Sequence, residues 1–201
     1  MNKLLLILIA AICLSLLLAT GCTADKSSKP SPAAVLEVSP TPSKAPEADS
    51  ISEFSVVAAA KNISLQAWDN EIDLSFLGTP ISEEVRVLDQ TSDTFAGSHV
   101  KKLKYDGLEL ELFSPKGNGK SFWIKEIIIT GDLYITPRGV SVDSTIGKLQ
   151  ELYPEMQQIP DGRTDPDNCS YIYKSTDGFS NIFFEVKAAK MINFKIYYEM
   201  P

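Results

Sequence analysis

Histidine and cysteine are scarce in this chain of 201 residues, which has one histidine, His99, and three cysteines. A Ser-His-Asp or Cys-His arrangement needs a histidine as its base, so any such site would have to use His99. That residue lies in no G-x-S-x-G motif, and one histidine with one cysteine beyond residue 22 cannot make the usual zinc sets. The sequence therefore predicts that the protein is not an enzyme and that His99 is an ordinary surface or turn residue.

Positive charge is also in deficit. The chain has 19 Lys and Arg against 26 Asp and Glu, which gives a net charge of −7. Binding to duplex nucleic acid depends on clustered Lys and Arg, so we expect no nucleic-acid partner. The chain also lacks a glycine-rich loop that could cradle a phosphate, and no cofactor is predicted.

Long hydrophobic runs are missing except at the start, where residues 4–19 are apolar apart from Ser15 and follow Lys3. A charged residue, an apolar core and then small residues are the layout of a secretory signal. The run is shorter than the roughly 20 residues that a membrane-spanning helix needs. A short retained span and ordinary signal cleavage are the alternative interpretations.

The end of this run, residues 18–22 (LATGC), resembles the lipobox of bacterial lipoproteins, with Ala19 where that family usually has leucine. The resemblance implies that residues 1–21 are a signal peptide and that Cys22 becomes the lipidated N-terminus. Two or three acyl chains on one cysteine give stable attachment to a membrane. We therefore expect a lipid-anchored protein on the extracytoplasmic face of the cell membrane.

Residues 22–50 form the predicted tether behind this anchor. The stretch 23–50 holds five of the twelve prolines and no aromatic residue, so it cannot bury enough apolar surface to fold. We interpret it as a disordered, Pro/Ser-rich spacer, with a Pro-rich ligand as the alternative. Residues 51–201 differ, because aromatic residues appear and apolar residues alternate with polar ones. They predict one globular domain.

Strand patterns run through this domain. Residues 102–113 alternate leucine with glutamate, and Asp106-Gly107 within them predicts a hairpin turn. Residues 122–130 predict another strand because they are rich in β-branched and aromatic side chains. Connections this short require antiparallel pairing. Three further strands are predicted at 172–174, 179–186 and 191–198, the last with Ile192, Phe194, Ile196 and Tyr198 on one face.

Two helices are predicted, each ahead of a group of strands. Residues 146–153 place their apolar side chains on one stripe, with Asp143 or Ser144 as the cap and Pro154 as the stop. A weaker helical pattern covers residues 69–77.

These elements predict an α+β fold, an antiparallel sheet with a few short helices on one face. The two halves, 51–130 and 131–201, each run from a helix into antiparallel strands. Two tandem helix-plus-strands repeats are therefore one interpretation, which the low identity between the halves leaves open.

The connection 134–144 (YITPRGVSVDS), followed by a helix that ends in LYP, resembles the T-x-R-G-I-x-V-G-[DS]-[ST] signature of small bacterial surface lipoproteins of unassigned role. The resemblance implies a fold similar to that of the β-lactamase inhibitor protein and of outer-membrane assembly lipoproteins, in which two helices pack on an antiparallel sheet. The second glycine of the signature is Asp143 here. Aspartate tolerates a left-handed backbone and can cap a helix.

One acidic loop is a candidate metal site. Asp161, Asp165 and Asp167 could offer oxygen ligands to calcium. The loop lacks the glycine of an EF-hand, and Thr176 stands where the bidentate glutamate would be. We interpret it as a solvated turn and predict no metal site.

The predicted function is that of a non-catalytic, membrane-anchored lipoprotein, a protein-binding or adaptor module of the cell envelope whose partner is an envelope protein. The adjacent aromatics Phe183-Phe184 and Tyr197-Tyr198 put one ring on each face of the sheet, so a ring could be available for binding. A solute-binding lipoprotein of a transporter and an envelope hydrolase are the alternatives. The first would need βαβ alternation, and the second a nucleophile motif.

Overall fold

The computed structural model describes residues 52–201, with only the backbone of Gln90, Ser92 and Asp93. The predicted signal peptide at 1–21, Cys22 and the predicted tether at 22–50 lie outside the described residues. No helix within the described part of the chain is long and apolar enough to cross a membrane.

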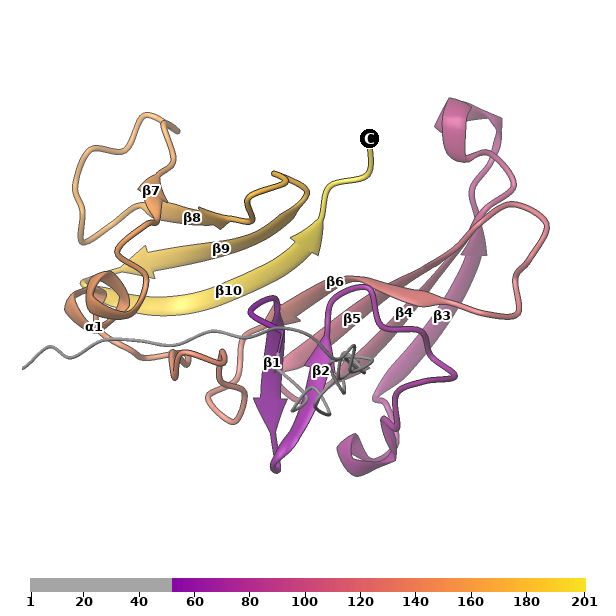
Figure 1. The fold of residues 1–201 in the computed structure, drawn as a ribbon, viewed down its shortest axis with the longest axis horizontal. Helices are drawn as coiled ribbons and strands as arrows, with labels where there is room; N and C mark the ends of the chain where they lie inside the picture. Colours follow the sequence, from indigo (N-terminus) through magenta and orange to yellow (C-terminus); the bar gives the residue numbers. More distant parts are fainter. Residues whose placement is uncertain (1–51) are drawn as a thin grey trace, which may run out of the picture. The chain divides into compact units, whose positions relative to one another are not determined.

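The centre of the fold is an eight-stranded antiparallel sheet in the order β3-β4-β5-β6-β10-β9-β8-β7. Each half of the domain contributes four consecutive strands, and the two groups meet where β6 pairs with β10 (Figure 1). The strands are β3 (Ser82–Val87), β4 (His99–Tyr105), β5 (Leu108–Ser114), β6 (Trp123–Ile129), β7 (Gln157–Gln158), β8 (Ser170–Lys174), β9 (Ser180–Lys187) and β10 (Lys190–Tyr198).

A separate hairpin packs on the buried face of this sheet. It consists of β1 (Ser55–Ala58) and β2 (Lys61–Ser64), whose Val56 and Ile63 are fully buried in the core. The chain after β2 joins the large sheet, because the Ile124 N–H of β6 donates to the Ala67 carbonyl at 2.9 Å. The hairpin is thereby held against the sheet.

The single α-helix of residues 52–201, α1 (Ile146–Leu152), lies where the sequence predicts it. Its cap is Thr145, whose hydroxyl accepts a hydrogen bond from the Lys148 N–H at 3.3 Å. The predicted cap of Asp143 or Ser144 was therefore wrong by one or two residues. The helix buries Leu149, and the following residue Tyr153 is also fully buried.

The predicted α+β class was wrong. The described residues form ten strands and one α-helix, so the domain is mainly β. The helix expected at 69–77 is replaced by turns and a 3₁₀ helix, η1 (Ser75–Leu77). Polar side chains explain the difference, because Asp73 accepts from the Ser75 N–H at 2.9 Å and Asp69 accepts from the Phe122 N–H at 3.1 Å. Aspartates that bond to backbone N–H groups in this way compete with a helix.

The predicted hairpin over residues 102–113 and the strands at 122–130, 172–174, 179–186 and 191–198 are confirmed, with small shifts of their ends. One detail of the last strand was wrong. A β-bulge between Met191 and Asn193 reverses the alternation, so Ile192 is 43% exposed while Met191 is buried.

Strand β3 was missed because all six of its residues are exposed and its sequence shows no alternation between buried and polar positions. It begins at a bulge, since the Ile81 N–H donates at 2.7 Å to the carbonyl of Lys104, which also lies opposite Ser82. The hairpin β1–β2 was missed as well, because its strands are too short to show a pattern.

Candidate functional site

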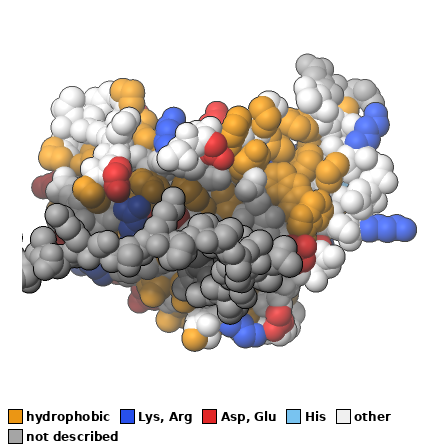
Figure 2. All heavy atoms as spheres, in the orientation of Figure 1, with side chains coloured by type: hydrophobic (Ala, Val, Ile, Leu, Met, Phe, Trp, Pro, Cys, Tyr) orange, Lys and Arg blue, Asp and Glu red, His pale blue; other side chains and the backbone are white. Residues whose placement is uncertain are grey.

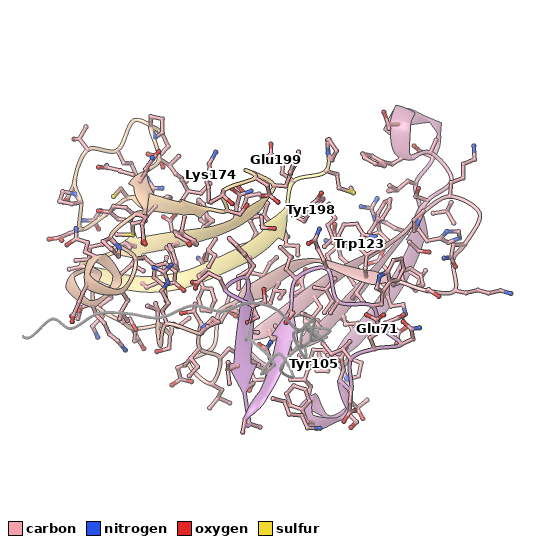
Figure 3. All side chains as sticks on the ribbon, viewed as in Figure 1. Glu71, Tyr105, Trp123, Lys174, Tyr198 and Glu199 are labelled. Atoms are coloured by element: carbon pink, nitrogen blue, oxygen red, sulfur yellow. The ribbon has the colours of Figure 1, made fainter. Side chains whose placement is uncertain are left out.

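An open apolar groove of about 570 Å³ lies between the hairpin β1–β2, η1 and the turn that joins β4 to β5. This volume falls in the range of roughly 300–1,000 Å³ that is typical of ligand pockets. Tyr105, which lines it from the end of β4, is labelled in Figure 3. The large side chains of the groove are Phe76, Leu77, Ile81, Tyr105, Leu133 and Tyr134.

Two aliphatic side chains on the groove face water. Ile81 is 69% exposed and Leu133 is 74% exposed, the two highest values among the large hydrophobic residues of the described chain. They come from separate segments, one just before β3 and one in the connection after β6. Apolar surface of this kind, gathered around a hollow, is typical of a binding surface.

A close approach of two glycines positions Leu133. Gly107 has a φ of +68°, and a Cβ there would lie 2.6 Å from the Cα of Gly131, so no other residue fits without a shift of the backbone. The N–H groups of Thr130 and Gly131 both donate to the Gly107 carbonyl, at 3.0 and 3.1 Å. The β4–β5 turn therefore anchors the connection that carries Leu133.

The polar end of the groove is formed by two tyrosines and an aspartate. The Tyr134 hydroxyl donates to the Asp106 carbonyl at 3.2 Å. Burial raises the pKa of Tyr105, with a smaller contribution from the charge of Glu83. Burial and the charge of Asp106 raise the pKa of Tyr134. Both phenols are thus neutral at physiological pH, and the carboxylate of Asp106 lies at this end of the groove.

Next to the groove, the connection 134–144 is anchored by Arg138, which contacts residues from both halves of the domain. The guanidinium forms ion pairs with Glu53 and Glu155, both at 3.0 Å, and donates to the Leu152 carbonyl at 2.9 Å. It also lies over the rings of Tyr153 and Tyr173. The arginine of the signature therefore links the N-terminus of the described chain, the end of α1 and β8.

The rest of this connection is a turn fixed by its own backbone. The Thr136 hydroxyl accepts from the Val140 N–H at 3.2 Å, and the Thr136 N–H donates to the Val140 carbonyl at 2.8 Å. Asp143 has a φ of +68°, in the left-handed region that favours glycine. The Lys148 ammonium donates to the Gly139 carbonyl at 2.7 Å and ties the turn to α1.

A second apolar surface lies where the end of β10 approaches β5 and β6. Its rings touch in series at centroid distances of 5.7, 5.7, 5.8 and 5.9 Å, in the order Phe95, Phe113, Trp123, Tyr198 and Phe179. Figure 2 shows hydrophobic side chains gathered beside the end of β10, and Figure 3 labels Trp123 and Tyr198 there. Because each ring contacts the next, this aromatic series joins the two halves of the sheet.

The adjacent aromatics predicted on the two sheet faces are not equally exposed. Phe184 is fully buried, whereas Phe183, Tyr197 and Tyr198 are half-buried. Of these rings, Tyr198 belongs to the aromatic series.

The single histidine is not part of the groove. His99 is half-buried at the start of β4, and its ring lies so close to Gly119 that a Cβ there would approach it to 2.9 Å. Its Nδ1 is buried without a hydrogen-bond partner among the described residues.

The structure does not bring the three carboxylates of the acidic loop together. Asp161 pairs with Arg163, which lowers the pKa of its carboxyl, and Asp165 bonds to the side chain of Asn168, which lowers its pKa as well. Within residues 52–201 no group of three or more His, Cys, Asp or Glu side chains is placed to hold a metal ion.

Cys169 is buried and free in this part of the chain. Its Sγ lies 3.6 Å from the Pro166 carbonyl oxygen at the end of the acidic loop.

The described residues thus form an antiparallel β-sheet domain with an open apolar groove. No protein-family model, curated protein or solved structure matches this chain. The resemblances of residues 18–22 and 134–144 to lipoprotein motifs therefore remain expectations from the sequence.

The groove residues were missed at the sequence level. Ile81 and Leu133 are isolated aliphatic residues in connections, where no periodicity marks them. Of the features that the sequence indicated, the Asp106-Gly107 turn and Tyr134 of the connection 134–144 lie beside them. The contact of Gly107 with Gly131 depends on the pairing of β5 with β6.

Proposed function

We propose that this protein is a non-catalytic binding module of the bacterial cell envelope, held at the extracytoplasmic face of the cell membrane by lipid on Cys22. We further propose that its groove takes a segment of an envelope protein, so that the chain acts as a tethered adaptor. The lipid anchor is supported by residues 18–22 and the binding role by the groove.

The exposure of Leu133 and Ile81 on the groove is the observation that carries the binding role. Leaving large aliphatic side chains in water forgoes roughly 25 cal/mol for each Å² that could be buried. A partner that covers both side chains recovers this free energy. The aromatic series is a weaker candidate because its rings already cover one another.

The chemistry of the groove favours one kind of partner segment. Its walls are apolar, so they suit a stretch with one or two large aliphatic or aromatic side chains. The exposed carboxylate of Asp106 lies at one end, and Glu83 is near enough to raise the pKa of Tyr105. An adjacent lysine or arginine in the partner would complement these charges.

Site-specific photo-crosslinking in bacterial cells tests this function. The full chain carries a benzophenone amino acid in place of Leu133, and a matched chain carries it in place of Ile192, which is also exposed but lies on β10 away from the groove. We expect a discrete crosslinked envelope protein from position 133 only. Asp106→Lys should reduce the yield several-fold, because it reverses the charge at the groove.

Two results would contradict the proposal. Equal products from positions 133 and 192 would indicate random contact, and the absence of any product at 133 would remove the groove as a binding surface. Peptides derived from the captured protein, synthesised with lysine or with glutamate beside the apolar residues, then test the charge preference directly. The lysine form should bind more tightly.

A further inference from the structure

Strand β3 forms an exposed edge of the large sheet (Figure 1). Within residues 52–201 it pairs with β4 on one side, and no strand pairs with its other side. Val85 and Val87 are 52% and 57% exposed. An open edge of this length is a template for another strand. The opposite edge differs, because β7 has only two residues.

The register with β4 shows which backbone groups of β3 are free. The Leu88 N–H donates to the Ser98 carbonyl at 2.8 Å, which continues the β3·β4 register beyond the strand. Hydrogen-bonded and non-bonded positions alternate along an antiparallel ladder. The backbone groups of the even-numbered residues therefore point toward β4, and those of Glu83, Val85 and Val87 point outward.

We propose that β3 pairs with β3 of a second copy of this chain, antiparallel and across a two-fold axis at Val85. In this register Val85 lies opposite Val85 of the second copy, and Glu83 lies opposite Val87. Outward-facing backbone groups then meet outward-facing groups in hydrogen-bonded pairs. The two eight-stranded sheets become one continuous sheet.

The charged side chains of β3 favour this register, and they favour a second copy of β3 as the partner strand. With the axis at Val85, Glu84 lies opposite Arg86 of the second copy, and symmetry repeats this pair. Moving the axis by one residue in either direction sets Glu84 against Glu84 or Arg86 against Arg86. Opposite charges placed directly across a sheet stabilise the pairing, and like charges destabilise it. The Glu-Val-Arg sequence is thus complementary to itself, as a two-fold interface requires.

The position of Val85 on the axis makes a single cysteine a test of the pairing. Hydrogen-bonded antiparallel partners have Cα atoms about 5.5 Å apart, within the range of about 4.4–6.8 Å that a disulfide spans. Val87→Cys is the matched control, with similar exposure on the same strand and face. In the proposed register, residue 87 of one copy lies opposite residue 83 of the other. The two residues at position 87 would therefore be four residues apart along the ladder, about 13 Å at roughly 3.3 Å per residue.

The experiment uses the full chain in membranes, oxidised briefly with copper phenanthroline and run on a non-reducing gel. We expect a dimer band for Val85→Cys that is at least five times stronger than for Val87→Cys or for the unsubstituted chain, whose Cys169 is buried. Equal bands for the two variants, or no band for Val85→Cys, would overturn the proposal.

A charge swap then tests the register. In the Val85→Cys chain, Glu84→Arg alone or Arg86→Glu alone should weaken the dimer band several-fold, because each creates like-charge pairs. The chain with both substitutions should recover it. Failure of the double variant to recover, with its circular dichroism unchanged, would overturn the register. Leu133→Asp alters the groove and not β3, so it should leave the dimer band unchanged. A failure of the proposed binding function of the groove can thereby be distinguished from a failure of the β3 pairing. If the band required Leu133, the groove would be the contact, which would also overturn the proposal.

Discussion

Arg138 stacks on Tyr153, with the guanidinium carbon 4.6 Å from the centre of the ring. Tyr173 lies 4.8 Å from the same carbon, so the cation is held by two aromatic rings. The side chain is three-quarters buried and pairs with two glutamates. This arrangement assigns the arginine of residues 134–144 a structural role, because it joins segments that are distant in the sequence.

Replacing Arg138 with alanine should therefore destabilise the domain. We expect the free energy of unfolding to fall by about 2–4 kcal/mol, from the lost contacts with the rings and from the glutamate left beside them. Arg138→Lys should recover only part of this loss, because an ammonium cannot stack or bond in two directions as a guanidinium does.

Urea denaturation followed by tryptophan fluorescence measures both variants. Lys187→Ala is the control, since Lys187 is exposed at the end of β9, and its effect should stay within about 0.5 kcal/mol. Equal stabilities for Arg138→Ala and Lys187→Ala would show that the aromatic stack contributes nothing.

The strands that could be predicted from the sequence are those whose side chains alternate between the core and the solvent. Leu108, Leu110 and Leu112 are all buried on β5, and Asp106-Gly107 forms the expected turn. The alternation and the turn both depend on neighbouring residues, so the sequence of this one segment is enough to predict the hairpin.

The features that could not be predicted depend on distant partners. Arg138 was identified within a motif, but its contacts Glu53 and Tyr173 lie 85 residues before it and 35 residues after it in the numbering of the chain. The turns at 69–77 fold as they do because Asp69 bonds to Phe122 on another segment. No periodicity within either segment reports such a contact.

The turn between β9 and β10 offers a route to higher stability. Ala188 and Ala189 have φ values of +51° and +59°, which alanine adopts at a cost. The favoured sequence for a two-residue turn of this kind is Asn-Gly. Ala188→Asn with Ala189→Gly should raise the free energy of unfolding by about 0.5–1.5 kcal/mol.

Thermal melts of this double variant and of Ala67→Gly test this expectation. Ala67 is not among the residues with positive φ, so glycine there should lower the melting temperature. If the Asn-Gly turn also lowered the melting temperature, strain at this turn would not be a source of instability.

Glu111 should make the stability of the domain depend on pH. Burial alone would raise the pKa of its carboxyl, but hydrogen bonds and attraction from Lys125 at 3.0 Å and Lys102 at 3.2 Å outweigh burial and lower it. A lowered folded-state pKa stabilises the protein above the unfolded-state value of about 4.3, and this contribution is lost as the pH falls through the folded-state pKa.

The variant Glu111→Gln should therefore melt at a lower temperature than the unsubstituted chain at pH 7, and the difference should shrink as the pH falls below about 4. Glu151→Gln, at an exposed position on α1, is the control and should change the melting temperature less at pH 7. A difference for Glu111→Gln that stayed constant from pH 7 to pH 3 would mean that the lysine pairs do not depend on its charge.

The lipid anchor gives the last prediction, which concerns the part of the chain outside the described residues. If Cys22 carries the lipid, Cys22→Ala should abolish incorporation of labelled palmitate and leave the chain unprocessed. Cys169→Ser is the matched control, because Cys169 is a buried thiol within the described domain. It should keep the label.

The physical reason for expecting a strong effect is the number of methylene groups involved. Each one buried in a bilayer contributes roughly 0.8 kcal/mol, so that two or three acyl chains hold a protein where one chain holds it only marginally. The processed chain is expected to pellet with membranes and to be released only by detergent. Labelled, membrane-bound chain of processed size from Cys22→Ala would assign the anchor to another residue, and the tethered adaptor would have to be reconsidered. Unlabelled chain of processed size that is released without detergent would indicate that ordinary signal cleavage can replace lipid processing.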